Sequence, residues 1–218
     1  MRRAFSCPIG ASDSSYCKVR LVALRSIAQN KKMSITQSNP NPTRYSRGAI
    51  ILHWSIAALI LSTIPLGWYG ASYETEAAQS ATNAHKAIGI AILALTLVRI
   101  GWRLTHLPPA LPDAMARSLR WIAKISHTLF YVLLLVMPLS GWWMSSAVPD
   151  RHSFGFGFFD IPFLPVPRGW ASAGPAHFIH TSLAWLMIAL AVLHIAAALK
   201  HHFIDRDDIL ARMLPNRS

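Results

Sequence analysis

The stretch HFIHTSLAWLMIALAVLHIAAAL, residues 177–199, is almost wholly apolar and carries His180 and His194 fourteen residues apart. A run of about 18 or more such residues is long enough to cross a hydrocarbon core of roughly 30 Å. At about 100° per residue, fourteen residues return to within roughly 40° of the same helix face, about 21 Å further along the axis. The stretch therefore predicts a membrane helix with two imidazoles on one face, at two different depths.

Three further apolar runs have the length of a membrane crossing, at residues 48–68, 84–101 and 121–147. Each of the four runs contains at least one histidine, and none contains Asp or Glu. The whole chain is 53% hydrophobic and 14% charged, whereas soluble domains carry about 25% charged residues. A soluble bundle would also show a polar face on each helix. We therefore predict an all-α, integral membrane four-helix bundle that forms one domain, residues 44–218.

The formal net charge of +12 is concentrated at particular connections rather than spread along the chain. Nine Lys or Arg residues precede the first run, and others gather between runs two and three and after run four. The two remaining connections are acidic or mixed, with Glu74, Glu76, Asp150 and Asp160 against only Arg151 and Arg168. Since positive charge marks the cytoplasmic side, we predict four crossings with both termini cytoplasmic. The charge thus reports topology within membrane lipid, and it does not indicate a nucleic-acid partner.

Residues 1–43 form a separate compositional block that is rich in Ser, Asn, Pro and basic residues. The block lacks the apolar core of a signal peptide, and its Cys7 and Cys17 imply no disulfide framework on the reducing side of the membrane. We expect a disordered tail or a start codon placed too far upstream. In the second case residues 1–32 are not translated and Met33 is the true start.

The depth of each histidine can be estimated from its distance to the end of its run, at about 1.5 Å per residue. On the fourth run, His180 lies near the outer end and His194 about two turns from the inner end. His85 lies at the outer end of its run, and His53 lies close to the inner end of its run. The depths pair His85 with His180 and His53 with His194. His127 lies at a depth similar to that of His194, so depth alone leaves His53 and His127 as equal candidates.

Two bis-histidine haems fit this arrangement, because bundle interiors are a usual place for such cofactors. Ionisable side chains inside membrane segments are rare and usually functional. The structural alternative is that each imidazole is a polar side chain whose hydrogen bonds are satisfied inside the bundle.

The histidines and their neighbours form a pattern that spans all four runs and the C-terminal tail, over residues 44–216. Its members are Tyr45-Ser46-Arg47, His53-Trp54, His85 with Gly89, His127, His180, His194, His201-His202 and Arg212-Met213-Leu214-Pro215. The pattern resembles the bacterial cytochrome b561 family, and within it the small four-helix superoxide oxidase type. The resemblance implies a multi-pass protein of the bacterial inner membrane with two haem b groups. It also selects His53 with His194 and His85 with His180 as axial ligands of the haem iron, and leaves His127 without that role.

The resemblance to the superoxide oxidase type further implies that superoxide is oxidised to oxygen at the outer side and that ubiquinone is reduced. Lys86 and Arg151 are then candidates for attracting the small anion, although such residues also pair with haem propionates. His201 and His202 are candidates for a quinone or proton site at the inner surface, or they simply cap the fourth helix. The alternative function is an electron-relay subunit between the quinone pool and a partner redox protein.

Overall fold

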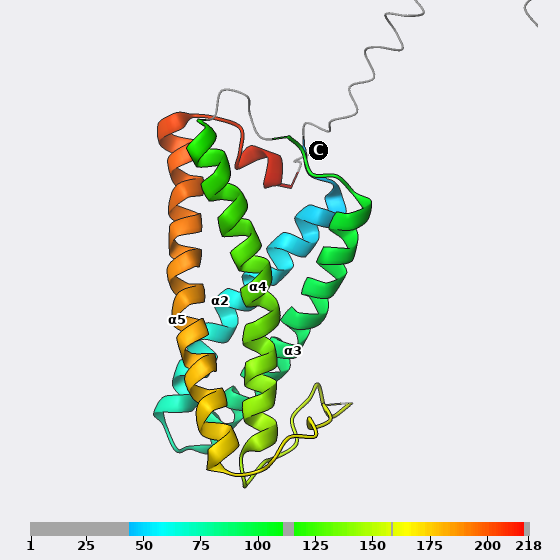
Figure 1. Cartoon of the computed structure of the whole chain (residues 1–218), viewed down its shortest axis with the longest axis vertical. Helices are drawn as coiled ribbons and strands as arrows, with labels where there is room; N and C mark the ends of the chain where they lie inside the picture. Colours follow the sequence, from blue (N-terminus) through cyan, green and yellow to red (C-terminus); the bar gives the residue numbers. More distant parts are fainter. Residues whose placement is uncertain (1–43, 111–115, 158, 216–218) are drawn as a thin grey trace, which may run out of the picture. The chain divides into compact units, whose positions relative to one another are not determined.

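A computed structural model describes residues 44–110, 116–157 and 159–215. The predictions for the tail and for Met33 lie outside these residues. Four long helices account for most of the described chain (Figure 1): α2 Arg47–Ser72, α3 Glu76–Thr105, α4 Arg117–Ala147 and α5 Trp170–Lys200. A π-helical turn, η1 His201–Asp205, and a short 3₁₀ turn, η2 Ala211–Met213, follow. The predicted all-α four-helix bundle is confirmed.

Two of the helices begin at hydroxyl caps. Ser46 caps α2 by accepting a hydrogen bond from the backbone N–H of Ala49, and Thr75 caps α3 in the same way at Ala78. Each cap satisfies one of the backbone donors that a helix leaves free at its start. The cap at Thr75 starts α3 well before the apolar run at residue 84, because capping and not hydropathy fixes the first turn.

The interior of the bundle holds an apolar layer to which all four helices contribute. Its buried members are Ile56, Ile92, Leu133, Leu134 and Met187. Met187 lies midway along α5 between the two histidines of that helix, seven residues from each. Seven residues correspond to about 10 Å along the axis. The layer therefore separates an outer level of histidines from an inner level.

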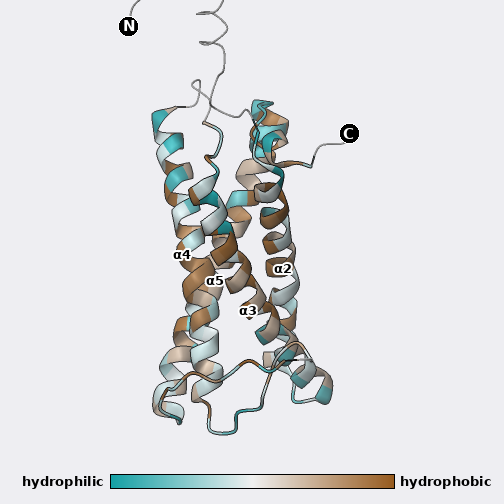
Figure 2. Ribbon diagram, turned by 90° about the vertical axis from the view of Figure 1, so that its right-hand side faces the viewer, coloured by the Kyte–Doolittle hydropathy of each residue, from teal (hydrophilic) through white to brown (hydrophobic). Residues whose placement is uncertain are grey.

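The outside of the bundle is apolar, as a protein surrounded by lipid requires. All four helices are long and apolar enough to cross a membrane, and only 6–17% of the residues in their most apolar windows are buried within the protein. Hydrophobic residues run along the middle of the helices, whereas hydrophilic residues gather near the ends (Figure 2). Large side chains such as Leu193, 67% exposed, have lipid as their only available apolar surroundings. The chain is thus a multi-pass membrane protein.

The connection between α4 and α5 is rich in aromatic residues, which predicts that it packs on the outer end of the bundle, and it does so. Trp142 donates a hydrogen bond to the carbonyl of Pro162, at 2.9 Å. Phe154 is buried, with Lys86 Nζ 5.5 Å from the centre of its ring. Apolar runs that end at residue 147 and begin again at residue 177 predict a connection of about thirty residues, and this prediction is wrong. The connection spans residues 148–169, because α5 begins at Trp170, before the apolar run, and continues through Pro175.

The described start of the chain and its C-terminal segment meet at the opposite end, called here the inner end, where α2 begins and α5 finishes. The indole N–H of Trp54 donates to the carbonyl of Met213 at 2.8 Å. Arg44 donates to the carbonyls of Ala211 and Leu214. Arg212 reaches the carbonyl of Ala110, which lies beyond the end of α3. Both ends of the described bundle domain therefore lie on one side of the membrane, as the prediction of four crossings requires.

Candidate functional site

The structure brings together His85 of α3 and His180 of α5 at the outer level. Their ring centroids lie 6.0 Å apart, and the ring planes are nearly perpendicular, at 86°. Both side chains are partly buried within the bundle. This is the outer pair that helix depth predicts.

Each ring of the outer pair is fixed by a hydrogen bond at Nδ1. His85 Nδ1 lies 2.9 Å from the carbonyl oxygen of Thr63 on α2, and His180 Nδ1 lies 3.0 Å from the carbonyl oxygen of Met137 on α4. A carbonyl can only accept, so each Nδ1 carries the proton and each Nε2 keeps its lone pair. Nε2 is then the atom available to a metal, the usual arrangement for a ligating histidine whose other nitrogen donates to a carbonyl.

The inner level holds three imidazoles from three helices. The ring centroid of His194 lies 6.4 Å from that of His53 and 5.8 Å from that of His127. Phe130 adds an edge contact to His194, at 5.1 Å. Both neighbours of His194 are thus close enough to be its partner, and distance favours neither of them decisively.

The residues at both levels fit a bis-histidine haem. A metal–imidazole bond of about 2.0–2.1 Å, together with the size of the ring, puts the centroids of two trans imidazoles about 6 Å apart. The observed 6.0 Å for His85–His180 is close to this spacing, and so are both distances at the inner level, 6.4 Å for His53–His194 and 5.8 Å for His127–His194. The protonated Nδ1 atoms of the outer pair also agree with haem binding, because they leave Nε2 free to bind iron. The apolar layer around Met187 keeps the two levels apart.

Arg99 of α3 lies near the inner end of the bundle, where it bonds to residues of both α2 and α4. Its guanidinium donates to the hydroxyl of Tyr131, at 3.3 Å, and to the carbonyl of Ala49, at 3.4 Å. Arg99 was not among the site residues predicted from the sequence. Its position inside the apolar run 84–101 could have marked it as a functional residue, because charged side chains within membrane segments are rare.

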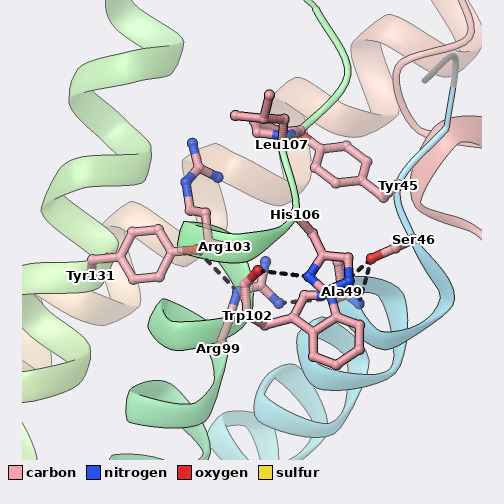
Figure 3. Close-up of a pocket in the computed structure, with 10 residues that line it drawn as sticks. Tyr45, Ser46, Ala49, Arg99, Trp102, Arg103, His106, Leu107 and Tyr131 are labelled. Atoms are coloured by element: carbon pink, nitrogen blue, oxygen red, sulfur yellow. Dashed lines mark hydrogen bonds between the residues drawn. The ribbon is translucent and has the colours of Figure 1, made fainter. Parts of the chain in front are cut away.

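An open hollow adjoins Arg99 at the inner end (Figure 3). Trp102 stacks on His106 on one side of it, with the rings 4.2 Å apart and nearly parallel. The indole N–H of Trp102 donates to the hydroxyl of Ser46. Arg103 lies over the ring of Tyr131 on the other side. The polar side chains that line the hollow largely bind one another or nearby backbone carbonyls.

The two candidates for anion attraction lie at the outer end, in different settings. Lys86 is partly buried and lines a hollow of about 760 Å³ that also reaches His177 and Trp170. Arg151 stacks on Phe163, with 4.1 Å from its guanidinium carbon to the ring centre, and donates to the carbonyl of Ser146. Both residues thus lie over an aromatic ring of the connection between α4 and α5, but only Lys86 also lines the hollow.

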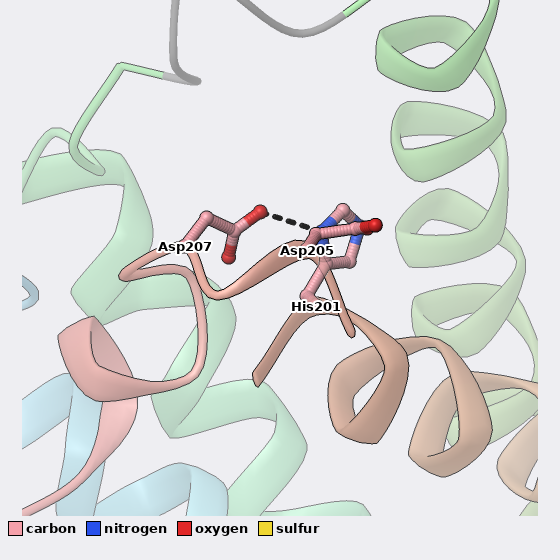
Figure 4. A group of neighbouring side chains, drawn as sticks. All are labelled: His201, Asp205 and Asp207. Atoms are coloured by element: carbon pink, nitrogen blue, oxygen red, sulfur yellow. Dashed lines mark hydrogen bonds and ion pairs between the residues drawn. The ribbon is translucent and has the colours of Figure 1, made fainter. Parts of the chain in front are cut away.

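The candidates for a quinone or proton site lie on η1, just beyond α5 (Figure 4). His201 Nδ1 is 2.6 Å from Asp207 and 3.3 Å from Asp205, whose carboxylate also pairs with Lys200 at 2.7 Å. One ligand atom from each of His201, Asp205 and Asp207 lies within 4.8 Å of the others. His202 is exposed beside Phe203. The structure thus gives His201 acidic partners and leaves His202 at the surface.

The C-terminal segment that follows carries one further ion pair. A guanidinium nitrogen of Arg212 lies 3.0 Å from a carboxylate oxygen of Asp208. The hydrogen bond from the Arg212 guanidinium lowers the pKa of the Asp208 carboxyl below its ordinary value.

Comparison with known proteins identifies relatives along nearly the whole described domain. Residues 44–216 match the family model described as prokaryotic cytochrome b561. Cytochrome b561 homolog 2 of Escherichia coli is 35% identical over 85% of this chain and 97% of its own length. Cytochrome b562 of Cereibacter sphaeroides is 30% identical, over 79% and 96%. A protein of Yersinia pestis named probable superoxide oxidase is 28% identical, over 80% and 97%.

Proposed function

Because the chain belongs to the prokaryotic cytochrome b561 family, whose members are b-haem electron carriers of the bacterial inner membrane, we propose that it carries two haems and passes electrons from superoxide to ubiquinone. The observation that supports this most strongly is the pair of histidine levels in one bundle, with rings 6.0 and 6.4 Å apart. The name of the Yersinia pestis relative supports superoxide as the donor.

We assign His85 and His180 to the outer haem, and His53 and His194 to the inner haem. Each haem, when bound, supplies a carrier for one electron. Two imidazoles would hold each haem iron, and the protein's role would be to fix the rings, exclude water and set the potential. His127 then packs beside the inner haem without binding its iron.

The overall reaction balances as two superoxide anions, one ubiquinone and two protons giving two oxygen molecules and one ubiquinol. Each superoxide loses one electron, and the quinone gains two electrons and two protons. Lys86 concentrates the anion, because it is a positively charged residue that lines the hollow at the outer end. Arg151 adds positive charge and also holds the connection in place through Phe163 and Ser146.

Protons for the quinone enter at the inner end in this proposal. His201 can exchange a proton with a carboxylate, because its Nδ1 lies 2.6 Å from Asp207 and 3.3 Å from Asp205. His202, exposed at the same surface, is the second candidate. The excess of basic residues at this end supports its assignment to the cytoplasm, with both termini inside. The outer end then faces the periplasm.

The experiment is stopped-flow mixing of the purified haem-loaded protein with superoxide and a soluble ubiquinone. Superoxide consumption faster than spontaneous dismutation, with one quinol formed per two superoxide anions, supports the proposal. If the haems stay oxidised in superoxide yet are reduced by quinol, the protein is instead an electron relay between the quinone pool and a partner redox protein. A Lys86→Gln variant tests whether Lys86 attracts the anion. If it does, the rate of superoxide consumption should lose most of its dependence on salt concentration in the variant, because the charge that salt screens is gone.

A further inference from the structure

The imidazole ring of His85 packs against α2 at Gly67, where any side chain would occupy the space of the ring. Thr63 offers two acceptors to Nδ1, its carbonyl oxygen at 2.9 Å and its hydroxyl at 3.0 Å. Gly67 follows four residues later, and a Cβ on it would lie 2.7 Å from His85 Nδ1. No side chain tolerates such an approach, so the missing Cβ lets the imidazole reach the carbonyl.

The ring of His180 meets the same arrangement on α4. The carbonyl of Met137 and the hydroxyl of Ser140 lie 3.0 and 3.1 Å from Nδ1. Gly141 follows Met137 by four residues, and a Cβ on it would lie 2.9 Å from His180 Cε1. Two different helices thus provide a carbonyl, a hydroxyl and a glycine to the two rings of one level. We call these two sites the ring cradles.

The inner level lacks such cradles within the described parts of the chain. There His53, His127 and His194 contact one another and neighbouring aromatic rings without a hydrogen bond at either nitrogen. A hydrogen bond from Nδ1–H makes an imidazole a more basic ligand. A more basic ligand favours the oxidised metal, and second-shell hydrogen bonds of this kind are one of the levers on haem potential.

We propose that the ring cradles hold His85 and His180 in the Nδ1-protonated form and thereby give the outer haem the lower reduction potential of the two. The inference rests on the proposed function, since it assumes that these two residues bind one haem. Thr63, Gly67, Ser140 and Gly141 are positioning residues in this account. Their effect is to make electron transfer from the outer level to the inner level favourable.

The test is a potentiometric titration of the haem-loaded protein, followed by absorbance. A His85→Ala variant first identifies the outer haem as the component that disappears. Thr63→Val and Ser140→Ala then each remove one acceptor while leaving the backbone carbonyl in place. We expect the outer component to be the lower-potential one in the wild type and to shift upward in both variants, with the inner component unchanged.

Gly67→Ala displaces the ring from both acceptors, so its shift should exceed that of Thr63→Val, or the outer haem should be lost altogether. Two matched controls should leave both potentials in place. Thr96→Val removes a buried hydroxyl that bonds only to the carbonyl of Ile92 on its own helix. Gly101→Ala adds a Cβ where nothing lies within 4 Å.

Unchanged potentials in both hydroxyl variants overturn the proposal, as does an outer component that has the higher potential. If Gly67→Ala does not accumulate, Thr63→Val and Ser140→Ala decide alone. If the His85→Ala variant keeps both haems, the ligand assignment and the cradles are overturned together. A normal loss of haem with unshifted potentials overturns only the cradles.

Discussion

Replacing His53 and His127 by alanine, one at a time, separates two imidazoles that lie at similar distances from His194. The ring centroids are 6.4 Å apart for His53 and 5.8 Å apart for His127. If His53 binds the iron, His53→Ala leaves the inner haem with one ligand. The haem content should then fall from two per chain toward one, a loss of about half, because each level holds one haem. His127→Ala should keep both.

The assay is haem content per chain together with the reduced-minus-oxidised spectrum of the two purified variants. Phe130→Leu is the control for packing, since that ring contacts His194 at 5.1 Å but cannot bind iron. Loss of one haem in His127→Ala with full content in His53→Ala would refute the assignment. Equal losses in both variants and in the Phe130 control would mean that packing, and not ligation, is being measured.

Three further outcomes follow from contacts at the two ends. Lys86→Gln should slow superoxide consumption and flatten its salt dependence, because a charge near the outer hollow is lost. Trp54→Phe should destabilise the protein by about 0.5–1.5 kcal/mol in detergent unfolding, since it loses the hydrogen bond to Met213. The Asp208–Arg212 pair, whose carboxyl has a lowered pKa, contributes stability above the ordinary carboxyl range. That contribution is lost as the pH falls through the lowered pKa. The protection factors of amide hydrogens in the C-terminal segment, which are exchange rates corrected for the intrinsic pH dependence, should therefore fall in acid, and less so in Asp208→Asn.

The predictions for Lys86→Gln and Trp54→Phe each have a matched control variant. Lys124→Gln removes a lysine that also lies over an aromatic ring, 5.4 Å from Trp121, but at the inner end; an equal slowing there would contradict attraction at the outer end. Trp185→Phe changes an exposed indole that makes a ring contact with Trp68, and a destabilisation as large as that of Trp54→Phe would contradict the role of the hydrogen bond.

The sequence predicted the parts of the fold that depend on hydropathy and helix periodicity. Four apolar runs required four crossings, and the spacing of His180 and His194 put two imidazoles on one face of α5. Depth then paired His85 with His180, which the structure brings to 6.0 Å. These predictions succeed because a helix of known rise converts sequence separation directly into depth.

Features that depend on contacts between helices could not be predicted from hydropathy and helix periodicity. The roles of Gly67 and Gly141 are an example, because only the approach of a ring from another helix requires a glycine at these positions. The bond between Arg99 and Tyr131 joins residues from two helices, and nothing in either segment indicates the other. The choice between His53 and His127 likewise depends on helix rotation, which depth does not specify.

The measurement that tests the central claim most directly is the number of b haems per chain in protein purified from a haem-replete host, repeated for His180→Ala and His194→Ala. The account predicts two haems in the wild type and one remaining in each variant, with different residual spectra. A wild-type protein with one haem or none would contradict it, and so would identical residual spectra in the two variants.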